Sequence, residues 1–342
     1  MINSLRYTII ITLTFILGSI NANFCNADPL AITPFYTFNQ SPLVQIYGLP
    51  AAESAIIQPA GHAWSLLAID VASNFTSHTT NRESILLDGE SDRITLALRY
   101  GLTDRLEMGV DLPWVGYNGG IFDSFVEGWH RFSGLPQGGR TRAPHNRLLF
   151  TYSKDDQERL RLDNANSGIG DIRLNSGWQL YHDGGPNPCA VALRASLKLP
   201  TGSRSQLRGS GSTDIALWLT GSDDFPLSKW WGHMTLFGAA GAMAMTNGQV
   251  LKDQQQNLAG FGSLGLGWSP RDWIALKTQV SLHSPFYQGS DLGELSHTAV
   301  QLLIGGTLAF SSRTALDIAV SEDARVATSP DVALHLGLSH QF

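Results

Sequence analysis

Residues 331–342 alternate between apolar and small or polar side chains, and this alternation limits the fold more than any other stretch. A period of two places the two sets on opposite faces of a β-strand. The pattern, ending on an aromatic residue, is typical of the closing strand of a bacterial outer-membrane β-barrel, with one face toward lipid and one toward the lumen. An edge strand of a soluble sandwich is the alternative. The apolar set, which includes the expected assembly signal Leu338 and Phe342, is Val332, Leu334, Leu336, Leu338 and Phe342.

Repetition of this alternation along the chain favours the barrel. In the clearest hairpin, residues 93–100 and 106–114 flank a short turn at 101–105. Short connections alternate with long ones, as they do between the periplasmic and external ends of outer-membrane barrels. We therefore predict an all-β fold, a transmembrane antiparallel β-barrel of about twelve strands over residues 62–342 with both termini in the periplasm. The other expected strands are 62–76, 171–180, 191–199, 213–220, 231–242, 258–268, 274–282, 300–310, 316–321 and 331–342.

Composition agrees with this class. Charged residues make up 15% of the 342, and no run of about eighteen apolar residues occurs, which excludes a helical membrane protein. The net charge of −6 lacks the basic footprint of a nucleic-acid-binding protein.

Residues 1–27 are expected to be a secretory signal peptide. Arg6 supplies positive charge, residues 9–20 form a short apolar core, and residues 25–27 offer small residues for cleavage. The mature chain would retain only Cys189 and form no internal disulfide. We expect an exported protein of the Gram-negative outer membrane.

Residues 28–61 contain five prolines and no sustained alternation, which argues against central strands. Such a segment either hangs in the periplasm or folds into the lumen. A freely solvated tail has no need for large apolar side chains, so we predict that it packs inside the barrel as a hatch or plug. Its apolar anchors are Phe35, Tyr36, Leu43, Val44, Ile46 and Tyr47.

The longest connection, residues 116–168, is expected to be a long external loop that contains a helix. Apolar residues recur at spacings of three and four over residues 122–132, the mark of an amphipathic helix. Three placements of this helix remain open: it could pack on the barrel mouth, enter the outer leaflet of the membrane, or plug the lumen.

Charged residues on the inward face of the expected strands carry both signs. A selective ion pore tends to carry rings of one sign, whereas mixed charges in a narrow barrel pair with one another and fill the space. This argues against a wide open porin. The expected lumen-lining residues are Arg93, Arg99, Glu107, Asp111, Asp171, Arg173, Arg194, Lys198, Asp214, Lys277 and Asp317.

Three weaker patterns invite other chemistry. His283 and Ser284 suggest an outer-membrane lipase, but adjacent residues are no triad, and we expect no catalytic residue and no cofactor. Acidic residues of the external loops could bind a divalent cation, although solvated turns are the simpler reading. Arginines of the long loop could contact lipid A phosphates. The alternative is that they only keep the loop soluble. The weak metal candidates are Asp291, Glu294, Glu322 and Asp323, with Asp331 nearby, and the arginines are Arg140, Arg142 and Arg147.

Several short motifs in one order give a family resemblance. They include residues 41–50, 86–90, 99–105, 123–136, 283–291 and 322–331. Together they resemble an uncharacterised family of Gram-negative outer-membrane proteins, domain of unknown function 3187. The resemblance spans nearly the whole mature chain and implies a barrel. It brings no catalytic residues, and the family is distantly similar to barrels that take up hydrophobic compounds, which is an analogy of fold.

The sequence is compatible with two main functions. The first is a largely closed or gated conduit for a small solute, with hydrophobic compounds among the candidates. The alternative is a non-transporting barrel that supports the envelope, and an outer-membrane enzyme is third. Expected partners are outer-membrane lipid and lipopolysaccharide, the barrel-assembly machinery and an unknown small molecule, with no nucleic acid.

Overall fold

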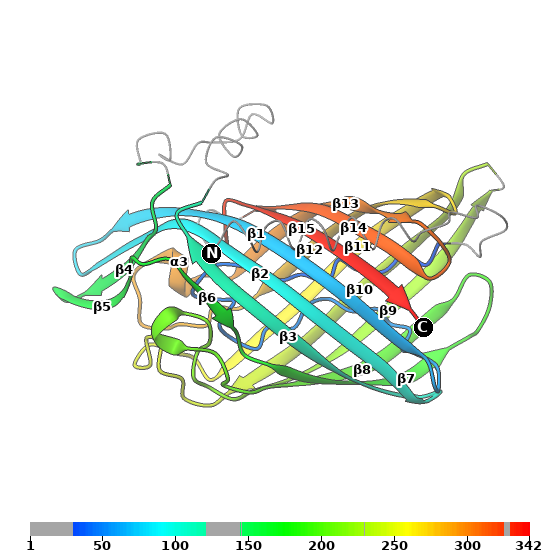
Figure 1. The fold of residues 1–342 in the computed structure, drawn as a ribbon, viewed down its shortest axis with the longest axis horizontal. Coiled ribbons are helices and arrows are strands. Elements are labelled where there is room, and N and C mark those ends of the chain that lie inside the picture. Colours follow the sequence, from blue (N-terminus) through cyan, green and yellow to red (C-terminus); the bar gives the residue numbers. More distant parts are fainter. Residues whose placement is uncertain (1–29, 121–143, 145, 229, 325–328) are drawn as a thin grey trace.

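Twelve antiparallel strands close into a barrel in the computed structural model, which describes residues 30–120, 144, 146–228, 230–324 and 329–342 (Figure 1). Fifteen strands form one sheet, and β4, β5 and β6 lie outside the ring. The predicted fold class and strand count are confirmed. The ring strands are β1 (Ala63–Thr79), β2 (Glu83–Thr103), β3 (Leu106–Asn118), β7 (Arg173–His182), β8 (Cys189–Lys198), β9 (Asp214–Ser228), β10 (Gly232–Met245), β11 (Leu258–Arg271), β12 (Ile274–His283), β13 (Ala299–Ala309), β14 (Thr314–Asp323) and β15 (Val332–Gln341).

The barrel closes between its first and last strands. β1 pairs with β15 from Trp64 opposite Gln341 to Ser73 opposite Val332. Phe342 N donates a hydrogen bond of 2.8 Å to Ala63 O beyond the ladder. Closure leaves no unpaired sheet edge in the ring, which is the condition for strands to cross a membrane.

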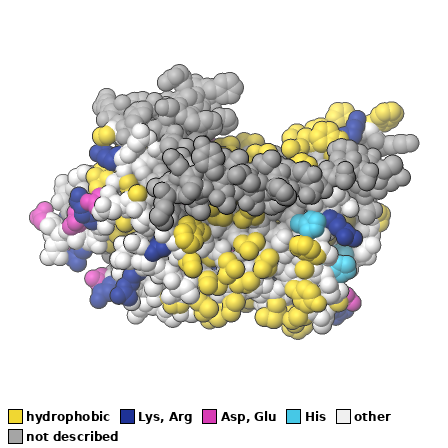
Figure 2. Space-filling model, viewed as in Figure 1, with side chains coloured by type: hydrophobic (Ala, Val, Ile, Leu, Met, Phe, Trp, Pro, Cys, Tyr) yellow, Lys and Arg dark blue, Asp and Glu magenta, His cyan; other side chains and the backbone are white. Residues whose placement is uncertain are grey.

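The two faces of the wall follow the sequence alternation. On β2, Leu96 and Leu98 are exposed while Ala97 and Arg99 are buried. Figure 2 shows hydrophobic side chains over the middle of the wall and charged side chains gathered toward both ends. An outward apolar band between two polar ends is the surface that a bilayer covers. No helix in the described ranges is long and apolar enough to cross a membrane.

The outward position of Leu96 gives a test of the register. It lies mid-strand between Leu67 of β1 and Leu112 of β3, so Leu96→Arg is expected to lower the free energy of unfolding by about 2–4 kcal/mol. The matched control is Leu102→Arg, which lies on the same strand beside the short turn and should cost only about 0–1 kcal/mol. Urea unfolding in lipid vesicles measures both values. Equal losses at the two positions would contradict this placement.

Extra strands extend the wall at the end that carries the long loops. β4 (Leu149–Lys154) pairs with β2 and with β5 (Gln157–Leu162), and β6 (Asn166–Ile169) pairs with β3. These strands lie in the expected long external loop 116–168, for which the sequence predicted a helix and no strands. The predicted helix over residues 122–132 lies outside the described residues. The one α-helix in the described part of the chain is the short α3 (Gly293–Ser296), and a 3-10 turn, η2, spans Arg204–Gln206.

The β9–β10 hairpin is longer than its sequence suggests. A turn is expected at residues 221–229, yet β9 continues to Ser228. Asp224, which resembles a turn residue, accepts hydrogen bonds from His233 Nδ1 at 2.7 Å and Thr235 Oγ1 at 2.6 Å across the hairpin. Pro226 fits beside the register shift between Gly232 and His233, an irregularity at which strands tolerate proline.

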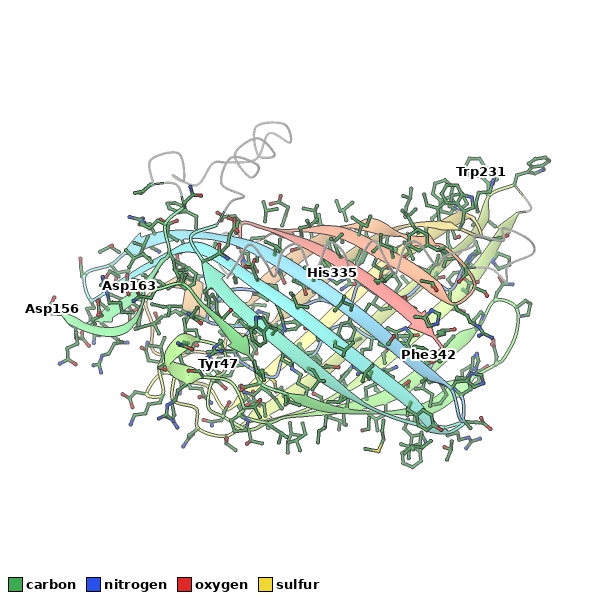
Figure 3. All side chains as sticks on the ribbon, in the orientation of Figure 1. Tyr47, Asp156, Asp163, Trp231, His335 and Phe342 are labelled. Atoms are coloured by element: carbon green, nitrogen blue, oxygen red, sulfur yellow. The ribbon has the colours of Figure 1, made fainter. Side chains whose placement is uncertain are left out.

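Figure 3 identifies the two ends of the barrel. Trp231, at the tip of the β9–β10 hairpin, and Phe342 lie at the end with the short turns. Asp156 and Asp163, which border β5, lie at the end with the long loops. We refer to these as the short-turn end and the long-loop end.

Candidate functional site: the filled lumen

Residues 30–61, called the plug below, lie mostly inside the barrel, with residues 59–61 exposed at the end of the segment. Figure 1 shows this segment as the dark blue trace running between the strands. The segment is irregular, with one tight turn in which Val44 N and Gln45 N both donate to Ser41 O at 2.9 Å. Most of its large apolar side chains are buried, including Ile32, Phe35, Leu43, Val44, Ile46, Tyr47, Leu49 and Ile57.

Side chains of the wall satisfy the backbone of the plug. Its prolines and irregular path prevent a regular ladder, so buried N–H and C=O groups need other partners. The wall supplies carboxylates and amides to plug N–H groups, and cationic or amide groups to plug carbonyls. The N–H donations are Phe35 to Gln279 Oε1 (3.0 Å), Gly48 to Asp214 Oδ2 (2.7 Å), Ile57 to Gln179 Oε1 (3.0 Å) and Gln58 to Glu107 Oε2 (2.8 Å).

The carbonyl contacts come from several sides of the ring. Their donors belong to β7, β8, β9 and β12, while β1, β2 and β3 contact plug side chains. A segment held from strands around the ring lies within it. The donors to plug carbonyls are Lys277 Nζ to Thr33 O (3.0 Å), Lys198 Nζ to Ile46 O (3.1 Å), Arg173 Nη2 to Tyr47 O (3.1 Å), Thr220 Oγ1 to Glu53 O (3.1 Å), Arg194 Nη2 to Ser54 O (2.7 Å) and Gln179 Nε2 to Ala55 O (2.8 Å).

Glu53, the one charged residue of the plug, joins a buried chain of alternating charges. Its Oε1 lies 3.1 Å from Arg99 Nη2, and its Oε2 lies 2.8 Å from Arg194 Nη1. Arg99 also contacts Asp111 Oδ1 at 2.8 Å, and Arg194 contacts Glu107 Oε1 at 2.8 Å. Both arginines therefore keep a wall carboxylate in addition to Glu53. The plug adds one negative charge to a wall cluster that is balanced without it.

A second polar centre surrounds Lys198, which is 1% exposed. Its Nζ contacts Asp171 Oδ2 at 2.7 Å, Asp214 Oδ2 at 3.2 Å and Ser210 Oγ at 2.6 Å. The plug approaches closely here, because a Cβ on Gly48 would lie 2.9 Å from Asp214 Cβ. Wall, loop and plug are thus joined through one ammonium group.

The structure places the predicted lumen-lining charges around the plug. Ten of the eleven are buried, and Asp317 is partly buried and 2.8 Å from Lys277 Nζ. Two acidic residues of the lumen, Asp70 and Glu53, were not among the residues predicted from the sequence. Asp70 Oδ1 accepts from Thr37 Oγ1 at 2.7 Å and lies 2.8 Å from His335 Nδ1, on a strand whose sequence faces are poorly separated. Glu53 could have been singled out as the only acidic residue of residues 30–61.

An apolar layer fills the lumen at the long-loop end. Tyr47 of the plug stacks on Phe286 at 4.9 Å between ring centroids and meets Tyr287 edge-on at 5.9 Å. Two cavities lie between the plug and the wall, with volumes of about 30 Å³ and about 20 Å³. The layer also includes Leu43, Ile46, Ile85, Leu87, Tyr117, Phe150, Tyr152, Leu207, Met243, Met245, Leu292 and Leu295.

The weaker sequence candidates are not assembled into sites. His283 Nε2 lies 2.9 Å from Asn39 Nδ2, and its Nδ1 lies 2.9 Å from the carbonyl oxygen of Ser284. The hydroxyl of Ser284 instead accepts from Gly260 N at 2.9 Å. The ring of His283 is thus not hydrogen-bonded to the hydroxyl that it would have to activate.

The rim residues are also dispersed. Glu294 pairs with His78 at 2.9 Å and Arg147 with Asp88 at 2.5 Å, while Arg140 and Arg142 lie outside the described residues. Within the described ranges, no group of three or more His, Cys, Asp or Glu side chains could hold a metal ion. This applies to the candidates Asp291, Glu294, Glu322 and Asp323.

Comparisons with known proteins agree with the barrel. The family model described as "Protein of unknown function (DUF3187)" matches residues 8–342. The COG4313 outer membrane channel from Pseudomonas putida F1 has a TM-score of 0.54 at 13% identity, covering 84% of this chain and 98% of that chain. Two other barrels are more distant. The NanC porin has a TM-score of 0.43 at 7% identity, covering 80% of this chain and 98% of that chain. The P. putida toluene transporter TodX has a TM-score of 0.34 at 12% identity, covering 83% of this chain and 89% of that chain. No curated protein matches. At 13% identity, the likeness to the COG4313 channel shows the fold alone.

Proposed function

The chain belongs to the DUF3187 family, whose function is unknown, and from that premise we propose that it is a gated outer-membrane conduit for a small compound, closed by residues 30–61. The short-turn end faces the periplasm in this proposal, as it does in other outer-membrane barrels. The observation that carries it is the way one irregular segment fills the lumen through polar contacts with the wall.

The chemistry of those contacts supports movement. Hydrogen bonds and ion pairs between plug and wall can be exchanged for contacts with water, so their net contribution to stability is modest. The only cysteine in the described residues is Cys189, which is free, so no disulfide ties the plug to the wall within that part of the chain. The plug can therefore leave its position without breaking the barrel ladder.

The apolar layer supports a hydrophobic solute. Aromatic and aliphatic side chains line the lumen at the long-loop end, where a solute from outside would first enter. Apolar pockets with a few polar groups are the usual surroundings of small-molecule sites. The same layer supports the second candidate, a non-transporting barrel, because a dry and well-packed core resists opening.

Glu53→Gln separates these candidates. The amide keeps the side-chain shape but loses the charge that contacts Arg99 and Arg194, while both arginines keep their wall carboxylates. We expect the barrel to stay folded and its openings in planar bilayers to become several-fold more frequent than the rare openings of the unmodified protein, since a charged hydrogen bond contributes about 1 kcal/mol more than a neutral one.

Glu158→Gln is the control, because its contact with Arg161 is half exposed on β5, away from the lumen. It should leave the openings unchanged. Unmodified protein that conducts continuously would refute closure by the plug. Silence of both the unmodified protein and Glu53→Gln would favour the structural barrel.

A further inference from the structure

Two buried guanidinium groups of the lumen face an aromatic side chain of the plug. Arg93 Cζ lies 5.1 Å and Arg173 Cζ lies 4.7 Å from the centroid of the Phe38 ring. Arg93 and Arg173 are 4% and 3% exposed. Both distances are within the range in which a cation is attracted to the face of a ring.

These two arginines differ from the other wall cations in their partners. Among the described residues, neither has a carboxylate oxygen within 4.0 Å, whereas Arg99, Arg194, Lys198 and Lys277 all have one. The Nε atoms of Arg93 and Arg173 are buried without a hydrogen-bond partner in the same set. The only hydrogen bond from this pair to the plug is Arg173 Nη2 to Tyr47 O at 3.1 Å.

Asp70 lies opposite Arg93 in the β1–β2 ladder and Asp111 lies opposite Arg173 in the β3–β7 ladder, but both carboxylates are engaged elsewhere. Asp70 binds Thr37 and His335, and Asp111 binds Arg99 and the hydroxyl of Tyr36. Buried charges are normally paired, because an unpaired one is expensive to hold away from water. The guanidinium groups of Arg93 and Arg173 therefore have no anionic partner among the described residues, and the ring of Phe38 lies against both of them.

We propose that Arg93 and Arg173 form a binding site for a planar aromatic carboxylate of the benzoate class, and that Phe38 fills its ring position in the closed barrel. The inference rests on the proposed conduit, since the ring leaves with the plug when the barrel opens. A guanidinium matches the two oxygens of a carboxylate, and its positive charge attracts an aromatic face. A ligand that carries both groups satisfies the pair more fully than Phe38, which supplies only the ring.

Phe38→Ala in the full chain tests the site without removing the plug. The truncation leaves space for a ring beside both arginines, and a cavity of that kind admits small aromatic molecules. We expect isothermal titration calorimetry in detergent to show benzoate binding to Phe38→Ala about tenfold tighter than benzamide, which has the same shape without the charge. The unmodified protein should bind benzoate at least roughly tenfold more weakly than the variant, because its own ring fills the site.

Further variants and ligands decide the assignment. Adding Arg93→Gln to Phe38→Ala should abolish the preference for benzoate over benzamide. Cyclohexanecarboxylate, which has the charge without an aromatic face, should bind more weakly than benzoate. Phe38→Leu replaces Phe38→Ala if the latter lacks the heat-modifiable mobility of a folded barrel. The site is refuted if folded variants bind no benzoate, prefer it no more than benzamide, or keep the preference without Arg93.

The binding readout separates this inference from the conduit. A protein that opens in bilayers but does not distinguish benzoate from benzamide keeps its conduit function and loses the proposed site. A protein that stays silent after plug deletion but binds benzoate through Arg93 keeps the site and loses the conduit.

Discussion

Deleting residues 30–61 is expected to convert a nearly silent barrel into one that conducts ions continuously. The plug now fills the lumen with buried side chains such as Phe35, Ile46 and Tyr47. A ring of twelve strands is wider than the eight-stranded barrel whose interior side chains just fill. Removal of the plug should therefore raise the mean current in planar bilayers by roughly tenfold or more.

The barrel itself should survive this deletion. Arg99 and Arg194 keep Asp111 and Glu107 at 2.8 Å, and Lys277 keeps Asp317 at the same distance. Wall groups that lose a plug partner gain water, which replaces a hydrogen bond at little cost. Heat-modifiable mobility on gels checks folding. A folded, silent deletion variant would assign the barrel a structural role.

Periodicity made the ring predictable, because each strand must present lipid on one side and the lumen on the other. On β2 this rule placed Leu96 outside and Arg99 inside, as the structure has them. The rule failed beyond the apolar band of the wall. There the end of β9 carries Asp223, Asp224 and Pro226, yet it still pairs with β10. Strand pairing at this end does not need an apolar outer face, so the alternation that predicts strands is lost.

The contacts of the plug could not be predicted in the same way. Four prolines and a series of apolar side chains in residues 30–61 indicate an irregular segment that packs against other parts of the protein, and the segment carries only Glu53 as a charge. Its partners Arg99 and Arg194 are 46 and 141 positions away along the chain. Barrel closure, not local sequence, brings them together. The unpaired state of Arg93 and Arg173 depends likewise on which carboxylates other residues have already engaged.

Lys198→Met is expected to lower the free energy of unfolding by about 3–5 kcal/mol, because it leaves buried charges without their counter-ion. Lys198 Nζ lies 2.7 Å from Asp171 and 3.2 Å from Asp214, both on the lumen side and buried. Methionine preserves much of the side-chain length but supplies no donor. The two carboxylates then face each other without a cation, and Ile46 O loses a donor at the same position.

Urea unfolding in lipid vesicles measures the loss, and two further variants identify its cause. Arg82→Met removes an ion pair with Asp155 whose side chains are 62% and 50% exposed, so it should cost at most about 1 kcal/mol. Adding Asp214→Asn to Lys198→Met removes one of the stranded charges and should recover part of the stability, since the amide oxygen can still accept from Gly48 N. If Lys198→Met costs no more than Arg82→Met, the lumen around Lys198 is hydrated enough to screen its carboxylates. The plug would then be held there by packing of Ile46 and Tyr47 and not by charge.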